Sequence, residues 1–446
     1  MSSNSPIQSE FPITPIGFGA NFISGYAFKS QDFCEKGLPV IKIKNIQDRI
    51  VTTASSQCVL PDLITEKLKK FLLDNGDVLI AMTGQGSVGR VGRLQCVKNM
   101  RPAMNQRVGK FVADEASLHK DFLYYVISSE TFENHLFAMG SGSGQPNLSP
   151  AAILSVGIPQ PAYQEQVAIA EILNALDDRI ALLCDTNTTL EAIAQALFKS
   201  WFVDFDPVRA KQEGREPEGM DADTAALFPD SFEESELGLV PKGWRVGTVA
   251  DIGEVICGKT PPTSEPANYG DDVPFITIPD MHNLLAVTST NRSLSTLGAN
   301  TQKKKTLPPG SICVSCIATA GLVVRVTTPS QTNQQINSVV PFTKWGYSFP
   351  LFTLRRIGDA VRAGGSGGSV FHNLSKSGFE KLKVLFPIEQ LTVVFGEIIE
   401  PIIEKIIKNQ KQAQTLATLR DTLLPRLISG QLRLPDVEAL IEEATA

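Results

Sequence analysis

The sequence predicts an α+β protein in which two tandem α/β modules are separated by two long helices that pair as an antiparallel intramolecular coiled coil. Three observations predict this fold: a heptad pattern over residues 164–202, a second over residues 390–428, and a set of landmarks that precedes each helix. Because the order is module, helix, module, helix, antiparallel pairing would give this internal repeat an approximate twofold axis. The predicted parts are the first module (1–160), the first spacer helix (161–203), an acidic linker (204–241), the second module (242–388), the second spacer helix (389–432) and an acidic tail (433–446).

Apolar residues in both helical stretches recur every three and four positions, which is typical of a coiled-coil seam. Asn187 and Asn409 are polar residues at seam positions, and Arg420 also interrupts the second seam. An apolar stripe is unstable in water, so we expect each helix to pack on the other, with the two asparagines helping to fix the register. The seam residues are Leu173, Leu176, Ile180, Leu183, Leu190, Ala194, Leu197 and Trp201 in the first helix, and Ile399, Ile402, Ile406, Ala413, Leu416, Leu423 and Leu427 in the second.

Seven landmarks occur in the same order in both modules, and the offset between copies drifts only from about 235 to about 226 residues. The pairs are 22–30 with 255–264, 38–45 with 273–280, 75–92 with 309–326, Asn105-Gln106 with Asn333-Gln334, the Gly/Ser loops 140–144 with 364–368, Asn147-Leu148-Ser149 with Asn373-Leu374-Ser375, and 155–161 with 383–387. Such an order indicates a tandem duplication.

Short β-branched runs and short apolar periodic runs alternate within each module. Residues 78–82 and 312–317 predict strands, whereas residues 121–128 and 378–383 predict short helices. The modules are therefore predicted to be of mixed α and β structure.

The chain of 446 residues is too long for one ordinary domain, and its 42% hydrophobic content is enough for the cores of two or three. It has no run of about 18 apolar residues, and its first residues lack the features of a signal peptide. We therefore expect a soluble, cytoplasmic protein with no membrane partner.

The net charge of −6 is unevenly distributed. Residues 204–236 carry a local charge of −8 and the tail after Arg433 carries four more acids, which leaves +6 on the rest of the chain. The folded parts are thus mildly basic, and the acidic total does not exclude a nucleic-acid partner.

The seven cysteines are odd in number and scattered, which predicts free thiols in a reducing compartment. Cys313 and Cys316 have CxxC spacing, but they lie in a predicted buried strand, where residues three apart face opposite sides. With no second CxxC and only four histidines, we predict packing and no metal site.

Residues 204–240 are acidic, contain Gly and Pro, and have few periodic apolar residues. We expect an exposed linker or an irregular loop that crosses back over the first helix. The aromatic string LFKSWFVDFDPVRAK (197–211) precedes it and predicts a hydrophobic plug at the helix end.

Three enzymatic interpretations are disfavoured. Gly84, Gly86 and Gly89 satisfy GxGxxG, but the residues that follow alternate like a strand and open no helix, so a tight turn explains them. A DNA methyltransferase would need an Asn/Asp-Pro-Pro-aromatic motif, and the nearest string, TPPT (260–263), lacks both ends. The sequence also contains no P-loop.

The duplicated architecture, GDVLIAMTG (76–84), the Asn-Gln pair, NLS before IPQP, YQEQ (163–166), FKSWFVDFDPV (198–208) and LRDTLLPRLISGQLRL (419–434) together resemble the specificity subunits of type I restriction-modification systems. The resemblance covers nearly the whole chain. It implies two target-recognition domains, each reading one half of a split, asymmetric double-stranded DNA sequence. It also implies that the two helices space these domains and dock two modification (methyltransferase) subunits and, through them, restriction (translocase and nuclease) subunits.

The same resemblance implies a non-catalytic subunit with no cofactor of its own, since S-adenosylmethionine, ATP and Mg would be bound by the partner subunits. A helix of about 37 residues is roughly 55 Å long, whereas one turn of DNA spans about 34 to 36 Å. We therefore expect helix length to set the spacer between the half-sites.

Side chains that contact DNA should be Arg, Lys, Asn or Gln on loops and element ends. The run Lys303 to Lys305 is the strongest phosphate candidate, while the Asn-Gln pairs and the Gly/Ser loops have equally good structural explanations. The DNA-contact candidates are Lys29, Gln85, Arg90, Arg93, Arg101 and Arg107 in the first module, and Lys259, Thr260, Arg292, Lys303, Lys304, Lys305, Arg325, Gln334 and Arg362 in the second. The alternative function is a non-catalytic assembly scaffold or another duplicated DNA-binding protein.

Overall fold

The computed structural model describes residues 5–96, 100–140, 146–317, 319–362 and 374–434. The chain forms two compact units. Unit 1 contains residues up to 180 together with those from 414 onward, and unit 2 contains residues 181–413. None of the helices in the described residues is long and apolar enough to span a membrane.

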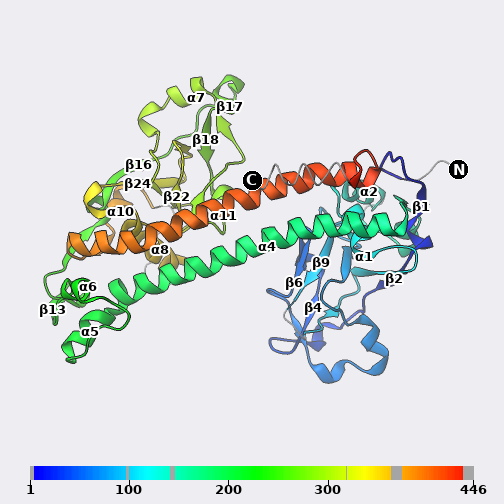
Figure 1. Ribbon diagram of the computed structural model, residues 1–446, viewed down its shortest axis with the longest axis horizontal. Helices are drawn as coiled ribbons and strands as arrows, with labels where there is room; N and C mark the ends of the chain where they lie inside the picture. The colour runs from blue at the N-terminus through cyan, green and yellow to red at the C-terminus, as the bar shows by residue number, and fades with distance from the viewer. Residues whose placement is uncertain (1–4, 97–99, 141–145, 318, 363–373, 435–446) are drawn as a thin grey trace. The chain divides into compact units, whose positions relative to one another are not determined.

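The module of unit 1 is built on a six-stranded sheet (Figure 1). Neighbouring strands are antiparallel except β6 and β9, which are parallel. Helices α1 (Lys120–Ile127) and α2 (Glu130–Gly140) follow the last strand. The strand order is β2 (Ala20–Ser24), β11 (Val108–Ala113), β8 (Val78–Ala81), β9 (Val91–Gln95), β6 (Ile50–Thr52) and β5 (Ile46–Gln47).

A smaller sheet and a two-stranded ribbon complete this module. The ribbon pairs β1 (Ile13–Pro15) with β12 (Gly157–Pro159), which brings the two ends of the module together. Helix α3 (Pro150–Leu154) precedes β12. The smaller sheet has the order β10 (Ala103–Met104), β4 (Leu38–Ile41), β7 (Cys58–Val59) and β3 (Phe33–Cys34), with β10 and β4 parallel.

The module of unit 2 repeats this topology, except that its larger sheet has five strands in the described residues, without a counterpart of β5. Its parallel pairs, β19 with β22 and β18 with β23, stand where β6–β9 and β4–β10 stand in unit 1. Its ribbon pairs β15 (Arg245–Thr248) with β25 (Lys383–Phe386). The two sheets are β16 (Gly253–Cys257), β24 (Ile336–Pro341), β21 (Ile312–Ser315), β22 (Val323–Val326), β19 (Ala286–Val287), and β17 (Tyr269–Gly270), β20 (Ser293–Leu294), β18 (Val273–Ile276), β23 (Gln331–Thr332).

The predicted duplication is confirmed by this shared strand order. The offset falls from 235 residues between β4 and β18 to 226 between the starts of the two long helices. Helix α8 (Ser348–Arg362) stands at the position of α1, and α10 (Lys376–Glu380) at that of α3. The glycine-serine loop at 140–144 lies outside the described residues beyond Gly140, as do the loop at 364–368 and Asn373.

Several predicted boundaries shift for local reasons. The strand predicted over 38–45 ends at Ile41, because Asn45 accepts the backbone N–H of Lys42 at 3.0 Å and closes a short 3₁₀ turn. The helix predicted over 378–383 instead begins at Lys376, since the N-cap Ser375 accepts the backbone N–H of Gly378 at 3.2 Å. Lys383 is then the first residue of β25.

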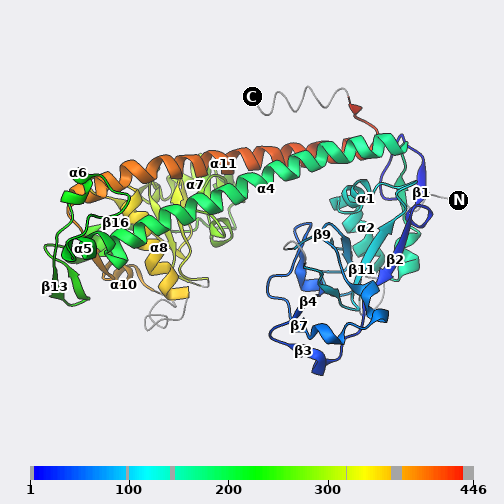
Figure 2. The same ribbon diagram turned by 60° about the horizontal axis from the view of Figure 1, so that its bottom comes forward.

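The long helices are α4 (Tyr163–Lys199) and α11 (Glu389–Ser429), and each contributes residues to both units. Within each unit the two helices lie side by side and antiparallel, as Figure 1 and Figure 2 show. In unit 1 Asp177 bonds to Arg420 at 2.6 Å, and in unit 2 the Phe198 and Phe395 rings lie 5.9 Å apart. Every predicted seam residue is buried or half-buried.

The polar seam residues meet in unit 2. Asn409, which is 1% exposed, donates to Asn187 Oδ1 at 2.8 Å, and Asn187 donates to the carbonyl of Ile406 at 3.2 Å. Arg420, the other interruption, lies in unit 1 and pairs with Asp177. The seam therefore contains paired polar groups where the heptad pattern is broken.

Of the two expectations for segment 204–241, an exposed linker or an irregular loop, the irregular loop is wrong: most of its residues are exposed, but it has regular elements. It contains α5 (Asp206–Gln212), α6 (Ala222–Ala226) and the hairpin of β13 (Phe232–Ser235) and β14 (Gly238–Pro241). Its apolar residues are too few to show periodicity, but single ones pack on the aromatic end of α4. Phe228 lies 5.3 Å from Trp201, ring to ring, so the predicted hydrophobic plug is present and orders this segment.

Phe198→Ala should destabilise unit 2 by about 3–5 kcal/mol, because Phe198 packs against four other phenylalanine rings in the core of that unit. All three tryptophans, Trp201, Trp244 and Trp345, lie in unit 2, so denaturant unfolding followed by tryptophan fluorescence reports on this unit. Phe342→Ala is the control, since Phe342 is 46% exposed in the same unit. Equal losses for the two variants would contradict this packing.

Candidate nucleic-acid interface

In the module of unit 1, three loops meet beside the ends of β2, β8 and β10. The backbone N–H of Tyr26 donates to Met104 O at 2.9 Å, and Gln106 N–H donates back to Tyr26 O at 2.9 Å. The N–H of Met82 donates to Arg107 O at 2.9 Å, which ties in the turn between β8 and β9. A Cβ on Gly25 would lie 2.1 Å from Asn105 O, so only glycine permits this approach.

The module of unit 2 builds the same loop cluster. Lys259 N–H donates to Thr332 O at 2.9 Å, and Gly258 N–H donates to Ile336 O at 3.1 Å. A Cβ on Gly258 would lie 2.0 Å from Asn333 O, as for Gly25 and Asn105. The two modules therefore present the same loops on the same backbone frame.

In each Asn-Gln pair the asparagine bonds to the backbone of its own loop, whereas the glutamine is exposed. Asn333 Oδ1 accepts the N–H of Gln335 at 3.1 Å, and Asn105 Oδ1 accepts the N–H of Arg107 at 3.4 Å, so both asparagines close a turn. Gln106 and Gln334 are exposed, and Gln334 Oε1 accepts a hydrogen bond from Thr260 at 2.5 Å. The internal explanation thus holds for the asparagines.

Most of the predicted DNA-contact side chains are exposed, and Gln85, Arg107, Lys259 and Gln334 belong to the loops of these clusters. Thr260 and Lys305 are half-buried, and Arg101 pairs with Asp74 at 2.7 Å. Arg292 lies over the ring of Tyr269 at 4.7 Å, and the side chain of Arg362 lies outside the described part of the chain. The exposed candidates are Lys29, Gln85, Arg90, Arg101, Arg107, Lys259, Arg292, Lys303, Lys304 and Gln334.

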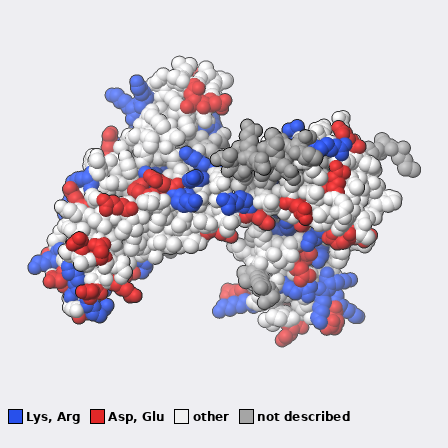
Figure 3. Space-filling view, viewed as in Figure 1, with Lys and Arg blue, Asp and Glu red and all other residues white. Residues whose placement is uncertain are grey.

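The lysine run at 303–305 forms a 3₁₀ turn directly after α7 (Thr296–Asn300). Gln302, buried beside it, donates to the carbonyl of Lys259 at 2.8 Å, so the run lies next to the loop cluster. Among the described residues none makes an ion pair with these lysines. Figure 3 shows basic side chains gathered near α7 in unit 2, and others, interspersed with acidic side chains, on the module of unit 1.

Two arginines that we predicted as DNA contacts instead hold the modules on the long helices. Arg93 donates to Asn174 on α4 at 2.9 Å and lies 4.0 Å from the centre of the Tyr124 ring. Arg325 pairs with Glu400 on α11 at 2.5 Å. Their side chains are only 22% and 14% exposed. Each guanidinium already donates to a helix residue, so few of its N–H groups are free to bond to DNA.

A sequence profile described as "Type I restriction modification DNA specificity domain" matches residues 20–192 and 241–416. Each match covers one module and part of the helix after it. The chain is also 39% identical over 354 residues to the type I restriction enzyme HindI specificity subunit of Haemophilus influenzae, which covers 70% of this chain and 77% of that protein. The chain belongs to this specificity family.

A second relative in the family is the type I restriction enzyme MjaIX specificity subunit of Methanocaldococcus jannaschii, 26% identical over 84% of this chain and 82% of that protein. The crystal structure of a type I restriction-modification S subunit from M. genitalium covers 96% of this chain and 99% of its own, with a TM-score of 0.57 and 16% identity. This last likeness is one of fold.

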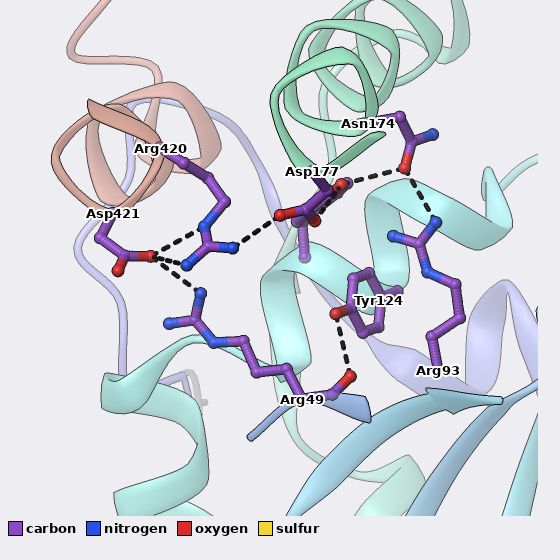
Figure 4. A network of polar contacts seen from close by, with 8 residues as sticks. Arg49, Arg93, Tyr124, Asn174, Asp177, Arg420 and Asp421 are labelled. Carbon is purple, nitrogen blue, oxygen red and sulfur yellow. Dashed lines mark hydrogen bonds and ion pairs between the residues drawn. The ribbon is translucent and has the colours of Figure 1, made fainter. Parts of the chain in front are cut away.

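Figure 4 shows a polar network of this specificity-family chain in unit 1, where the module meets both helices. The Tyr125 hydroxyl donates to Asp177 at 2.8 Å, and Asn174 Oδ1 lies 2.9 Å from the same hydroxyl oxygen. The Tyr124 hydroxyl donates to the carbonyl of Arg49 at 3.1 Å. Burial, followed by the nearby charge of Asp177, raises the pKa of Tyr125, so its hydroxyl stays a donor at neutral pH.

The turn that carries Arg49 is strained. Asp48 and Arg49 have φ values of +50° and +64°, a region that disfavours residues other than glycine. Arg49 in turn donates to Asp421 on α11 at 3.0 Å (Figure 4). The strained turn therefore ends in a contact with the second helix.

Sequence reasoning missed the helix residues that receive these arginines, although a signal was present. Asn174 and Glu400 occupy equivalent positions, eleven residues after the first residues of α4 and α11. Their partners Arg93 and Arg325 are the third residues of the equivalent strands β9 and β22. Aligning the two repeats would have shown that the arginines are equivalent to each other and that their helix partners are too. Charge and predicted exposure alone could not show this.

Lys42 and Lys44 are further basic residues of the loop cluster that sequence reasoning omitted. Lys42 Nζ lies 3.8 Å from the centre of the Phe33 ring, and Lys44 Nζ donates to the carbonyl of Ser55 at 2.9 Å. Burial, and to a lesser extent Lys44, lowers the pKa of Lys42. Both residues follow β4. The alternating pattern of 38–45 predicted a longer strand that included them, so it did not indicate that they lie in a loop.

The glycines of the GxGxxG string form the turn between antiparallel strands. Gly84, Gly86 and Gly89 have φ values of +110°, +70° and +87°, which glycine adopts readily. The strand predicted after them is β9, and it pairs with β8. The GxGxxG string therefore forms the turn that reverses the chain between β8 and β9.

Of the CxxC cysteines, Cys313 lies in β21 and Cys316 directly follows that strand, and their side chains pack into different hydrophobic clusters. Cys313 packs with Ile276 and Ile336, whereas Cys316 belongs to the core that contains Phe198. Burial raises the pKa of the Cys313 thiol to about 12. Within the described ranges, no group of three or more His, Cys, Asp or Glu side chains is arranged to hold a metal ion.

We expect a thiol reagent such as DTNB to label Cys184 in the native protein and Cys313 and Cys316 only on unfolding, because the thiolate is the reactive form and burial suppresses it. Peptide mapping by mass spectrometry separates the sites, and Cys184→Ser should remove one native label. Native labelling of Cys313 as rapid as that of Cys184 would contradict the packing of β21.

Proposed function

We propose that this chain is the DNA sequence-specificity subunit of a type I restriction-modification complex, with each module reading one half of a bipartite, asymmetric target. The observation that carries the proposal is that two modules of one topology present different side chains from equivalent loops. A shared backbone frame with unlike exposed groups suits recognition of two unlike sequences by one binding mode.

The loop clusters provide the candidate reading surfaces. Module 1 offers Arg107, whose guanidinium suits guanine, and Gln85, whose amide suits adenine. Arg90 is exposed as well, but it lines a pocket with Arg49 and Glu133. Module 2 offers Gln334 and Lys259 at its own cluster, with Lys303 and Lys304 beside it for phosphates. The asparagines that close the turns are frame residues in both modules and are not proposed as reading residues.

The paired helices supply the second part of the proposed function. Helix length would set the spacer between the half-sites, and exposed helix faces would dock two modification subunits and, through them, restriction subunits. Catalysis would belong to these partners, which would also bind S-adenosylmethionine, ATP and Mg. This chain would contribute recognition and geometry only.

The competing function is an assembly scaffold that binds the other subunits and does not read DNA. The test is to express the chain with its modification subunits and to map methylated bases by single-molecule sequencing. We expect methylation at one bipartite, asymmetric sequence. Methylation without a sequence motif would favour the scaffold and overturn the proposal.

Replacing residues 1–155 by the same segment of another member of the family should change one half-site and leave the other half-site unchanged. The reason is that module 1 makes its loop cluster entirely from its own residues. The methylated motif is again the measurement. A change in both halves, or in neither, would show that the modules do not read independently.

Lys303→Ala with Lys304→Ala should weaken DNA binding by a similar factor on all sequences and lower the slope of log K against log salt by about 1 to 2, since each phosphate contact contributes about 0.9. The control is Lys242→Ala with Lys381→Ala, which removes the same charge from exposed positions of the same unit. A loss confined to one base position, or equal effects of the two variants, would contradict a phosphate role.

A further inference from the structure

Three side chains form an anchor between the module of unit 1 and α4. Arg93 donates to Asn174 at 2.9 Å and lies 3.7 Å from Asp121, the second residue of α1. Asn174 donates in turn to Asp121 at 3.0 Å. The acid of this anchor, Asp121, belongs to the module. The helix contributes the neutral amide of Asn174, which Figure 4 shows bonded to Arg93.

The equivalent anchor in unit 2 has the same positions but a different arrangement of charge. Arg325 pairs with Glu400 on α11 at 2.5 Å, and Ser348, the first residue of α8, donates to the other oxygen of Glu400 at 2.6 Å. Here the acid belongs to the helix, and the module contributes a neutral hydroxyl. Asp121 and Ser348 both lie at the start of equivalent helices, as the second and the first residue, and Asn174 and Glu400 occupy equivalent positions.

Each anchor contains one arginine and one carboxylate. Asp177, which contacts the same Tyr125 hydroxyl as Asn174, is paired with Arg420, so the unit 1 anchor and its surroundings are also neutral. If module 1 met a glutamate at the helix position, Asp121 and the glutamate would compete for one arginine. If module 2 met an asparagine there, Arg325 would lose its carboxylate. The side chains are only 14–27% exposed, so either mismatch would leave a charge partly buried and uncompensated.

We propose that the position of this carboxylate, on the module in unit 1 and on the helix in unit 2, matches each module to its own long helix. Asp121, Asn174, Ser348 and Glu400 are then positioning residues that exclude the wrong module by charge. The inference concerns packing within each unit and does not depend on the proposed DNA recognition.

The modules also contact the other helix, but those contacts do not distinguish the modules. Arg49 pairs with Asp421 on α11, and Arg355 pairs with Glu191 on α4. In both cases the module supplies the arginine and the helix the acid. Exchange of the modules would keep that complementarity, so sorting rests on the anchors at Arg93 and Arg325.

The test exchanges the helix residues without changing composition. The variant Asn174→Glu with Glu400→Asn has the amino-acid content and net charge of the native full chain, but both anchors are mismatched. A four-fold variant that adds Asp121→Ser and Ser348→Asp restores both anchors with the charges transposed. Thermal unfolding is followed by tryptophan fluorescence for unit 2 and by amide hydrogen exchange in α1 for unit 1.

The double variant should unfold about 4–10 °C below the native chain, or fail to fold, with faster exchange in α1. The four-fold variant should recover most of the native midpoint and protection. A double variant with a native midpoint, or a four-fold variant no more stable than the double, would overturn the inference. Because no DNA is used, failure here is distinct from failure of the proposed function.

Discussion

Burial of one apolar helix seam against the other is the interaction on which the rest of the structure depends. α4 and α11 pair in both units, and each module is bonded to residues of both helices. Asn409, almost fully buried, donates to Asn187 within the seam of unit 2. A shift of one helical turn would separate these amides and leave polar groups unpaired in an apolar contact, which gives the pairing a defined register.

The duplication makes two kinds of position visible. Gly25 and Gly258, or Ser149 and Ser375, are the same residue in both copies because the backbone approach or the helix cap demands it. Arg107 and Gln335 occupy the same place in the loop after the Asn-Gln turn but differ in chemistry. Frame residues persist between copies and surface residues diverge, as expected of one scaffold adapted to two partners.

The sequence was sufficient for the architecture because a period of about 230 residues and a heptad seam are both properties of linear order. It was insufficient for the arginines. Arg93 and Arg90 look alike in the chain, yet Arg93 meets Asn174, 81 residues away, and Arg90 is exposed. The prediction for segment 204–241 was incomplete for a related reason. Phe228 packs on Trp201, which is distant in sequence, so the residues next to Phe228 gave no sign that the segment is ordered.

The proposed role of the helix pair is to set the spacing between the two half-sites. It is tested most directly by inserting one heptad after Ile180 and another after Ala413, which lengthens both helices by about 10 Å while keeping the seam in phase. Methylated-base sequencing should then show the same two half-sites with a longer spacer, by up to about three base pairs. Altered half-sites with the original spacer would contradict the account.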